Sequence, residues 1–340
     1  MIDLRSYLAD CRQLAIDEIR RLVPAESPCG PILYDLMLEY PLRGAKGLRP
    51  ALCIATCRAL GGGLEPVLPS AAVLELYHNA FLVHDDVEDG SESRRDLPTL
   101  HREHGVPIAI NVGDGMLALA LAPLLDNTRH VGVGKALRIL QMIARMARET
   151  AEGQAMELDW VRRCHWDVTD DDYRCMVTKK TSWYSFIAPI AIGAIVAGAT
   201  DEQLAALEEL GRELGIAFQI RDDVLNLTSG GRYGKEAHGD LWEGKRTLIL
   251  LHVLRALDDT DRARARDILA TPRRAKAAAD VAALLTWIDA QGSIAYATTV
   301  GHDHAARARE ALRAIEPWLL PSSHRDVLRA IIEFTVDREN

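Results

Sequence analysis

The sequence predicts an all-α fold. Hydrophobic residues make up 48% of the chain and aromatic residues only 5%, and the composition is rich in alanine and leucine, which favours helix over strand. Nearly every segment repeats apolar residues at i, i+3 and i+4, as buried helices do, and no run alternates cleanly enough to predict a strand. We therefore expect a helical bundle with about a dozen helices.

Glycine- and proline-rich stretches separate the predicted helices. Along the chain these breaks fall at residues 24–30, 61–66, 90–98, 105–107, 127–134, 166–172, 229–244 and 271–272. Ser70 is expected to cap the helix that starts at Ala71, and Thr169 with Asp172 forms a predicted capping box. The longest apolar run, residues 186–199, has 14 residues. A membrane span needs roughly 20, so this run is interpreted as a buried core helix and no transmembrane segment is expected.

The whole chain, residues 1–340, is interpreted as a single domain, because no Pro/Ser-rich or single-charge linker divides it. The chemistry-bearing motifs lie between about residue 40 and residue 250, and further helices are expected over residues 251–340. Within that C-terminal part, residues 261–280 are rich in arginine and alanine. We interpret them as a solvated helix pair outside the main bundle.

Charge and cysteine usage exclude some classes of protein. The formal net charge is −9, which argues against a binder of duplex nucleic acid, because such proteins present a basic face. The first residues lack the basic and apolar regions of a secretory signal. Six cysteines are scattered without a C-x-x-C pair, so we expect reduced core thiols and a cytoplasmic protein.

Two acidic clusters end apolar helices that lie 137 residues apart. The first runs from Asp85 to Asp89, and the second contains Asp222 and Asp223. Asp85 and Asp89 lie one helical turn apart on the same face, so their carboxylates are side by side and repel each other. Divalent cations with oxygen ligands relieve such repulsion, and magnesium is usually held by carboxylates, waters and substrate phosphates. The alternative is a solvated acidic helix end, although the apolar helices place both clusters near the core.

Basic residues follow each acidic cluster. Arg94 and Arg95 come after the first, and Lys235 and Lys245 after the second. Arginine forks onto phosphate and lysine supplies point charge, so carboxylates mixed with these residues indicate a magnesium site for a diphosphate. No Gly-x-x-x-x-Gly-Lys-Ser/Thr loop occurs, which argues against a P-loop nucleotide site.

An ordered series of motifs resembles the trans-isoprenyl diphosphate synthases, also called polyprenyl synthetases. A single acidic motif is a weak signal, but the series covers residues 40–250 and is specific. It consists of Gly44–Pro50, His78, His84–Asp89, Arg94-Arg95, Pro98–His101, Gly113-Asp114, Gly153-Gln154, Lys180-Thr181, Phe218–Asp223, Gly234-Lys235, Asp240 and Glu243–Lys245. The resemblance implies an all-α bundle of the isoprenoid synthase type with a central cavity.

The same resemblance implies a role for each matching residue. Metal ions, usually three magnesium ions in the family, would be bound by Asp85, Asp89 and Asp222, with Asp86 and Asp223 acting in a second shell or through water. The allylic diphosphate would be held by Arg94, Lys180, Lys235 and Lys245. Isopentenyl diphosphate would be held by Lys46, Arg49, His78 and Arg95. His78 lies seven residues before Asp85 on the same helical face, so both substrates would lie along one wall of the bundle.

The implied reaction is a condensation of the two diphosphates. The allylic diphosphate ionises, the isopentenyl double bond attacks the resulting carbocation, and a proton is lost to the departing diphosphate. Lys180 would bind the leaving group, while the Thr181 hydroxyl and Gln219 would steady the cation through their dipoles. Apolar walls would keep water from quenching it.

Product length in this family depends on the bulk of residues one or two turns before the first acidic motif. Phe81 lies four residues before Asp85 and Tyr77 eight before it, so their rings can stack as a floor for the growing chain. We hypothesise a short product, farnesyl or geranylgeranyl diphosphate. The alternative is that both rings are ordinary core aromatics.

Three positions depart from the family pattern. Asn226 replaces the usual third aspartate of the second motif, Gly47 stands where an arginine is common, and Asp96 after the paired arginines is unusual and could moderate their charge.

Three other functions compete with this interpretation. A terpene synthase on the same fold is one alternative, but it would have little use for the isopentenyl diphosphate residues. An HD-type phosphohydrolase, suggested by His84-Asp85, would leave the second cluster unexplained. A non-catalytic subunit of a two-chain synthase is the third. Related enzymes commonly form homodimers, so a homodimer is expected.

Overall fold

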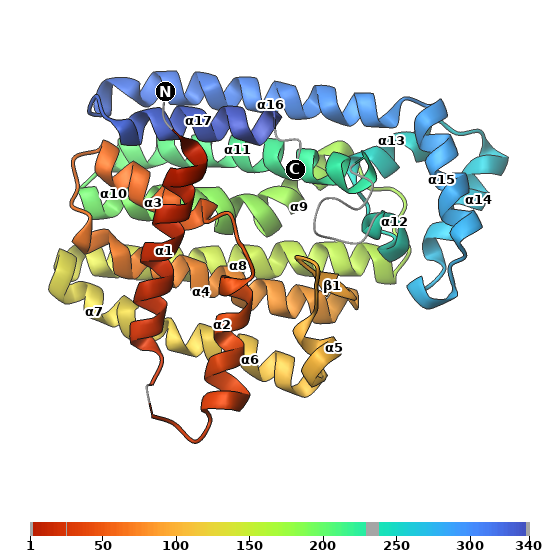
Figure 1. Ribbon diagram of the computed structural model, residues 1–340. Helices are drawn as coiled ribbons and strands as arrows, with labels where there is room; N and C mark the ends of the chain where they lie inside the picture. Colours follow the sequence, from red (N-terminus) through yellow and green to blue (C-terminus); the bar gives the residue numbers. More distant parts are fainter. Residues whose placement is uncertain (1–2, 25, 229–237, 338–340) are drawn as a thin grey trace.

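The chain folds as a helical bundle (Figure 1). This computed structural model describes residues 3–24, 26–228 and 238–337. The predicted all-α fold is confirmed. In chain order, the first helices are α1 (Leu4–Leu22), η1 (Gly30–Tyr34), α2 (Asp35–Leu42), α3 (Leu48–Ala59), η2 (Glu65–Val67), α4 (Leu68–Asp89), α5 (Leu100–His104), α6 (Val106–Leu119) and α7 (Leu121–Val131). They are followed by α8 (Val133–Arg162), α9 (Asp170–Val177), η3 (Thr178–Ile187), α10 (Ala188–Ala197), α11 (Asp201–Thr228), α12 (Gly239–Glu243), α13 (Leu248–Ala256), α14 (Asp259–Ala270), η4 (Arg273–Ala275), α15 (Ala278–Ala290), α16 (Ser293–Ile315), η5 (Glu316–Trp318) and α17 (Ser323–Asp337).

A short hairpin corrects the expectation that no strand is present. Strand β1 (Ser93–Arg94) pairs antiparallel with β2 (Leu97–Pro98) within the predicted break after α4. Arg95 and Asp96 form the turn, and both have positive φ, at 55° and 62°. Two-residue hairpin loops favour this left-handed conformation because its twist matches that of the strands. The strands are too short for sequence alternation to reveal them.

The start of α4 also differs from the prediction. The helix begins at Leu68, before the proposed cap, because Pro69 needs no backbone partner in the first turn of a helix. Ser70 is therefore a buried residue inside α4, and its hydroxyl accepts a hydrogen bond from Asn127 at 3.1 Å. The sequence predicts a break at residues 127–134, but Asn127 lies within α7. The Thr169–Asp172 capping box at the start of α9 is confirmed.

Three long helices, α4, α8 and α11, run through the middle of the molecule (Figure 1). Two clusters of buried apolar side chains stabilise the bundle. The N-terminal half of α11 contributes Leu207 and Leu214 to the first cluster, and its C-terminal half contributes Ile220 and Val224 to the second. Because one helix belongs to both clusters, we propose that the chain is one domain.

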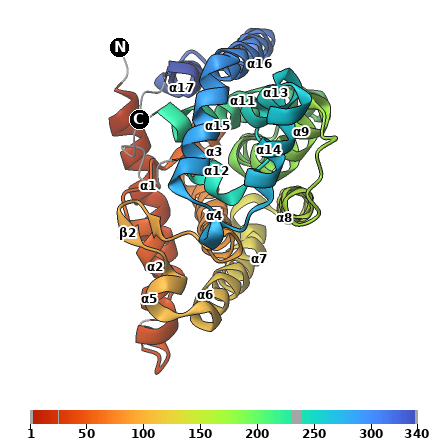
Figure 2. The same cartoon turned by 90° about the vertical axis from the view of Figure 1, so that its right-hand side faces the viewer.

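Helices α14 and α15 lie at one end of the bundle, beside α12 (Figures 1 and 2). Their position outside the main bundle agrees with the prediction. The prediction that both helices are solvated is wrong. Ala265, Ile268 and Leu269 of α14 are buried in the second cluster, together with Val281 and Leu284 of α15. The arginines between these apolar residues hide the apolar face in the sequence.

Among the residues that the structure describes, two helical stretches are long and apolar enough to span a membrane by length and composition alone. In one, Asp170–Ala197, 83% of the 18-residue apolar window is buried in the protein, as in core helices of globular proteins. This agrees with the buried helix predicted at residues 186–199. In the other, Val106–Val131, 39% of the window is buried. It comprises α6 and α7, which form an outer layer of the molecule (Figure 1).

Close packing of α8 against η3 depends on one glycine. A Cβ at Gly153 would lie 2.3 Å from the backbone nitrogen of Lys180 and 2.7 Å from its Cα. Side chains essentially never approach a backbone so closely, so only glycine permits this contact. The contact brings Lys180 to the centre of the bundle, where the predicted site lies.

Candidate active site

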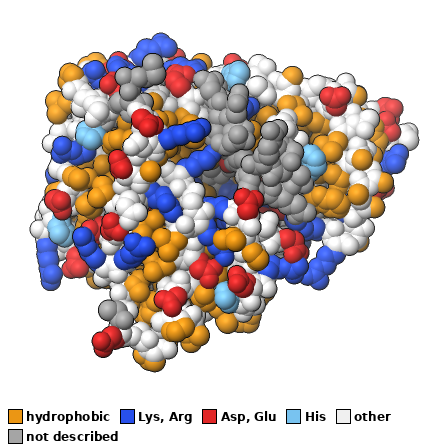
Figure 3. All heavy atoms as spheres, in the orientation of Figure 1, with side chains coloured by type: hydrophobic (Ala, Val, Ile, Leu, Met, Phe, Trp, Pro, Cys, Tyr) orange, Lys and Arg blue, Asp and Glu red, His pale blue; other side chains and the backbone are white. Residues whose placement is uncertain are grey.

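A cavity of about 1100 Å³ lies between α4, α8, η3 and α11. Its lining combines charged side chains with apolar and aromatic ones. On the surface, several lysine and arginine side chains gather around a hollow near the centre of one face (Figure 3). The cavity therefore has a charged region and an apolar region, as a ligand with an anionic head and a hydrocarbon tail requires.

The first acidic cluster places Asp85 in the lining of this cavity and Asp89 in the lining of a small adjoining one, and turns Asp86 away from both. Asp85 lies 3.6 Å from Arg94 and 3.4 Å from Lys180. Asp89 accepts a hydrogen bond from Lys245 at 2.8 Å. Asp86 is fully buried and accepts from the Tyr40 hydroxyl at 2.7 Å and from Arg94. Asp86 thus fixes Arg94, while Asp85 and Asp89 remain at the site.

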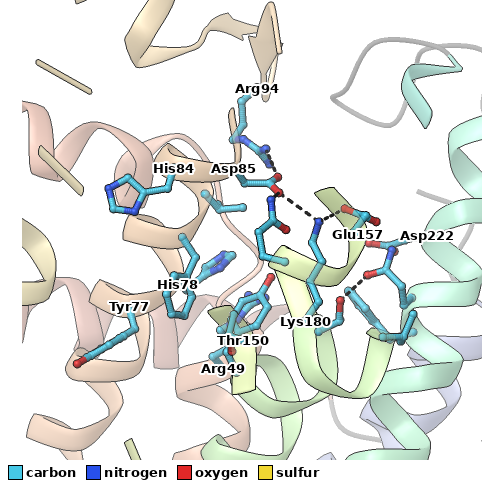
Figure 4. A pocket seen from close by; sticks show the side chains of 18 of the residues that line it. Arg49, Tyr77, His78, His84, Asp85, Arg94, Thr150, Glu157, Lys180 and Asp222 are labelled. Atoms are coloured by element: carbon cyan, nitrogen blue, oxygen red, sulfur yellow. Dashed lines mark hydrogen bonds and ion pairs between the residues drawn. The ribbon is translucent and has the colours of Figure 1, made fainter. Parts of the chain in front are cut away.

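The second acidic cluster lines the same cavity from α11. Figure 4 shows Asp222 across the cavity from Asp85, with Lys180 between them. Asp223 accepts hydrogen bonds from the Tyr173 hydroxyl at 2.7 Å and from the Gln219 amide at 2.8 Å. Burial raises the pKa of Asp223 to about 6. The two acidic helix ends therefore share one cavity.

Lysine side chains bridge the acidic groups. Lys180 pairs with Glu157 as well as with Asp85, and Lys245 pairs with Asp89 and Glu243 at 2.8 and 2.9 Å. Burial alone lowers the pKa of Lys245, but Asp89 and Glu243 outweigh it, so the pKa is raised well above its usual value. Both ammonium groups are therefore charged.

Glu157 is a site residue to which sequence reasoning gave no role. It is buried on α8, and burial raises its pKa, but the charges of Lys180 and Lys245 outweigh this and lower it. It is therefore an anion. Its position three residues after Gln154, on one helical face, was the available signal.

The four residues assigned to isopentenyl diphosphate all line the cavity. Arg49 donates to the Ser185 hydroxyl at 2.6 Å and lies over the Tyr184 ring at 4.5 Å. His78 is buried against the same ring, and burial together with Arg49, Arg95 and Arg94 lowers its pKa well below the usual value. The imidazole is thus neutral in a cationic surrounding. The Arg95 guanidinium donates to the Tyr40 carbonyl at 2.7 Å, and the Lys46 ammonium lies 5.4 Å from the centre of the Phe334 ring.

Gly47 is explained by its neighbours. Its φ is +70°, and a Cβ there would lie 2.6 Å from the Cβ of Arg12 and 2.7 Å from the carbonyl oxygen of Leu8. An arginine at this position would clash with α1. Helix α1 thus fills the space that a side chain at position 47 would need. Lys46, before Gly47, and Arg49, after it, still line the cavity.

The two aromatic residues of the predicted floor meet in the cavity, together with a third. The rings of Tyr77 and Phe81 lie 5.9 Å apart between centroids, and the ring of Phe81 lies 5.6 Å from that of Tyr184. Sequence reasoning missed Tyr184, which lies four residues after Lys180.

Thr150 of α8 also lines the cavity (Figure 4). Its hydroxyl is buried and has no hydrogen-bond partner among the described residues.

A hydrogen-bonded row crosses the cavity between η3 and α11. The Thr181 hydroxyl donates to the Gln219 side-chain oxygen at 2.8 Å, and the Gln219 amide donates to Asp223. The segment that carries Lys180 and Thr181 is a π-helix of ten residues. Such segments are rare and frequently occur at functional sites, and the sequence pattern did not predict it.

Three further predicted positions have distinct outcomes. Lys235 lies outside the described residues. Asn226 accepts a hydrogen bond from the backbone N–H of Asp240 at 3.2 Å, so the residue that replaces an aspartate anchors the start of α12. His84 faces α6, 3.4 Å from the Ile110 carbonyl oxygen and 3.5 Å from Asp114, and does not join Asp85 as an HD-type site would require.

An all-α bundle in which two acidic helix ends and several cations surround an aromatic-lined cavity defines an isoprenoid synthase-type enzyme. The family model described as Polyprenyl synthetase matches residues 31–288. The chain belongs to the polyprenyl synthetase family and is a prenyltransferase.

Individual relatives agree with this assignment. A short chain isoprenyl diphosphate synthase from Methanothermobacter thermautotrophicus is 34% identical over 100% of both chains. The crystal structure of a geranylgeranyl pyrophosphate synthetase from Pyrococcus horikoshii is 34% identical, with a TM-score of 0.85 and coverage of 98% of this chain and 99% of that one. A polyprenyl synthase from Caulobacter crescentus, complexed with calcium and isoprenyl diphosphate, is 27% identical, with a TM-score of 0.83 and coverage of 98% and 95%.

Proposed function

We propose that the protein is a short-chain trans-prenyltransferase that condenses isopentenyl diphosphate with an allylic diphosphate. One observation carries this proposal: the acidic ends of α4 and α11 open into the same cavity, beside an apolar region lined by aromatic rings. A terpene synthase would use the same acidic ends, but it would not need the second cationic cluster, in which Arg49 and Arg95 surround the neutral His78.

The donor set of the acidic ends fits magnesium. Asp85, Asp89 and Asp222 offer hard oxygen ligands, which this ion prefers. Asp89 is mostly buried, and burial raises its pKa, as does the charge of Asp85. Added positive charge at this point would stabilise the ionised carboxylates. When bound, the metal supplies positive charge to the leaving diphosphate, and we adopt three ions as the number implied by the resemblance.

Protein cations complete the allylic diphosphate site. We assign Arg94, Lys180 and Lys245 to this ligand, with Lys235 as a further candidate. Lys180 and Lys245 are held in place by carboxylates before substrate arrives, so their charge is preorganised where negative charge develops on ionisation. The row from Thr181 to Gln219 then places two oxygen atoms near the cation that remains.

A separate cationic pocket suits isopentenyl diphosphate. Burial lowers the pKa of His78, and Arg49 and Arg95 lower it further; the contribution of the arginines is the effect expected where several positive charges gather for an anion. The neutral His78 has a buried ring nitrogen, Nδ1, without a hydrogen-bond partner among the described residues. Because Nδ1 is closed off from the cavity, we infer that the other ring nitrogen of His78, Nε2, donates to the diphosphate together with the guanidinium groups, with Lys46 at the outer edge.

The aromatic rings suit a short product. We propose farnesyl or geranylgeranyl diphosphate as the product. Phe81 lies one turn and Tyr77 two turns before Asp85, and both line the wall of the cavity. Tyr184 packs against Phe81 from η3 and narrows the cavity from the opposite side. The growing chain would stop where these rings meet.

We also propose a homodimer, formed through α6, α7 and the start of α8. This face exposes apolar side chains, namely Val106, Ile108, Ile110, Leu121, Leu125, Val133, Leu137 and Leu140. Contiguous exposed apolar residues mark association surfaces, and a second copy of the same face is self-complementary about a twofold axis. The six cysteines are free thiols, which supports a cytoplasmic location.

Incubation of the purified protein with magnesium and isopentenyl diphosphate tests the proposed reaction. Separate reactions contain dimethylallyl, geranyl or farnesyl diphosphate, and the products are sized by chromatography and mass. We expect dimethylallyl and geranyl diphosphate to be extended only when isopentenyl diphosphate is present, and farnesyl diphosphate to be extended only if the product is geranylgeranyl diphosphate. Consumption of an allylic diphosphate alone, with cyclised hydrocarbon as product, would instead support a terpene synthase.

A further inference from the structure

The chain beyond α13 reaches back to the active site. We define the C-terminal clasp as residues 269–276, from the end of α14 through η4. Its Arg273 guanidinium donates to the Glu243 carboxylate at 2.9 Å. Its Lys276 ammonium, which is buried, donates to the carbonyl oxygens of Leu241 and Trp242 at 2.6 and 3.0 Å. These three acceptors belong to α12, immediately before Lys245.

A third contact shows that the clasp packs closely against the turn from Glu243 to Arg246. A Cβ at Gly244 would lie 2.6 Å from the carbonyl oxygen of Leu269, and Gly244 has a φ of +71°. Both the space and the conformation require glycine. On the opposite side, Arg246 donates to the carbonyl oxygen of His165 at 2.9 Å. The turn from Glu243 to Arg246 is therefore held on two sides.

Ion pairs connect the clasp to the metal-binding aspartates. Arg273 binds one oxygen of Glu243, and Lys245 lies 2.9 Å from the other. Lys245 in turn lies 2.8 Å from Asp89. Arg273 also lines a small cavity of about 30 Å³ together with Asp85 and Asp89, and this cavity shares Asp85 and Lys245 with the main one.

The sharing of Glu243 between two cations has a physical consequence. With Arg273 present, one carboxylate oxygen is neutralised, and Lys245 is shared between Glu243, Asp89 and an incoming anion. Without Arg273, a mostly buried carboxylate would have Lys245 as its main cation, and that pairing would compete with the ligand for the ammonium group. The side chain of Glu243 would also lose the contact that orients it.

We propose that Arg273 is a positioning residue of the allylic diphosphate site, acting through Glu243 to hold Lys245 opposite Asp89. This rests on the proposed function, in which Lys245 binds the allylic diphosphate. The isopentenyl diphosphate site around Arg49 and His78 contains no residue of the clasp. Loss of Arg273 therefore acts on one substrate and not on the other.

The test compares Arg273→Met with Arg274→Met, which removes the neighbouring exposed arginine. For Arg273→Met we expect KM for the allylic diphosphate to rise about tenfold, equivalent to about 1.4 kcal/mol, with KM for isopentenyl diphosphate unchanged. Binding of inorganic pyrophosphate in the presence of magnesium, measured by calorimetry, should weaken by the same factor. Arg273→Lys should restore most of the loss, and Arg274→Met should resemble the wild type.

Several outcomes would overturn the inference. They are an unchanged allylic KM in Arg273→Met, equal rises of both KM values, or failure of Arg273→Lys to restore binding. If Arg273→Met does not fold, Arg273→Gln, which stays polar but carries no charge, takes its place: the inference expects its pyrophosphate affinity to fall about tenfold, whereas a merely structural role expects the affinity of the folded variant to be unchanged. A wild-type protein without condensation activity would refute the proposed function, whereas the pyrophosphate titrations would still test the role of Arg273.

Discussion

Substitution of Gly153 by alanine should separate α8 from the segment that carries Lys180. The new Cβ would lie 2.3 Å from the Lys180 nitrogen, 2.7 Å from its Cα and 2.8 Å from the Lys179 carbonyl carbon. Since ordinary contacts begin near 3.4 Å, the two helices must move apart by about 1 Å. All three atoms belong to backbone, so no side-chain rotation relieves the clash.

Two effects of known size follow from that movement. Overpacking of a close contact costs about 1–3 kcal/mol of folding free energy. A displacement of about 1 Å in a substrate-positioning group lowers the rate by roughly 100-fold. We therefore expect Gly153→Ala to remain folded with reduced stability, and to lose far more activity than stability, because Lys180 no longer lies beside Asp85 and Glu157.

The matched control is Gly134→Ala on the same helix, where a Cβ meets no atom within 4 Å. Alanine there should be neutral or stabilise the helix by up to about 1 kcal/mol. Urea unfolding gives the stability of both variants, and a steady-state condensation assay gives kcat. If Gly153→Ala had wild-type kcat and stability, the close contact between α8 and η3 would not constrain the site.

Three other predictions concern product length, pH and assembly. Phe81→Ala should give longer products from a farnesyl primer, because it removes the ring that lies between Tyr77 and Tyr184; an unchanged product distribution would show that this ring is not the floor. In metal-free protein, the pKa of Asp223 is raised from 3.8 to about 6. Between these two pH values the folded state keeps a proton on Asp223 that the unfolded state has lost. The free energy of unfolding should therefore fall as the pH rises through this window. Asp223→Asn should reduce the dependence of the free energy of unfolding on pH, measured by denaturant titrations at several pH values. If the variant and the wild type showed the same pH dependence, burial would not raise the pKa of Asp223. Leu125→Glu, on the face formed by α6 and α7, should convert a dimer to monomers in light scattering, whereas Leu320→Glu, equally an exposed leucine, should not; a dimer that survives Leu125→Glu would place the interface elsewhere.

The sequence predicted the class of fold and most of the cavity lining. Apolar periodicity gave the helices because a helix buries one face, and that face repeats every three to four residues. Asp85 and Asp222 of the acidic ends and the cations Arg94, Lys180 and Lys245 all line one cavity, and Asp89 lines a small cavity that shares Asp85 and Lys245 with it. Chemistry that needs a particular residue type leaves its mark in the sequence.

Errors arose where neighbours distant in the chain decide the local structure. Ser70 is a plausible cap in isolation, but Asn127 binds it from α7, 57 residues away. The hairpin at Arg94 is too short to show alternation, and the apolar face of α14 is hidden between arginines. In each case the stabilising partner lies in another part of the chain.

What the sequence determined by itself is therefore the helical pattern and the identity of the charged groups, because both depend on residue type and local spacing. Only the tertiary structure decided which groups meet. It turned Asp86 toward Tyr40, placed Tyr184 against Phe81, and brought Arg273 to Glu243 across 30 residues. Hydrogen bonds and ion pairs act over a few ångströms, and only packing of the whole bundle brings such side chains within that distance.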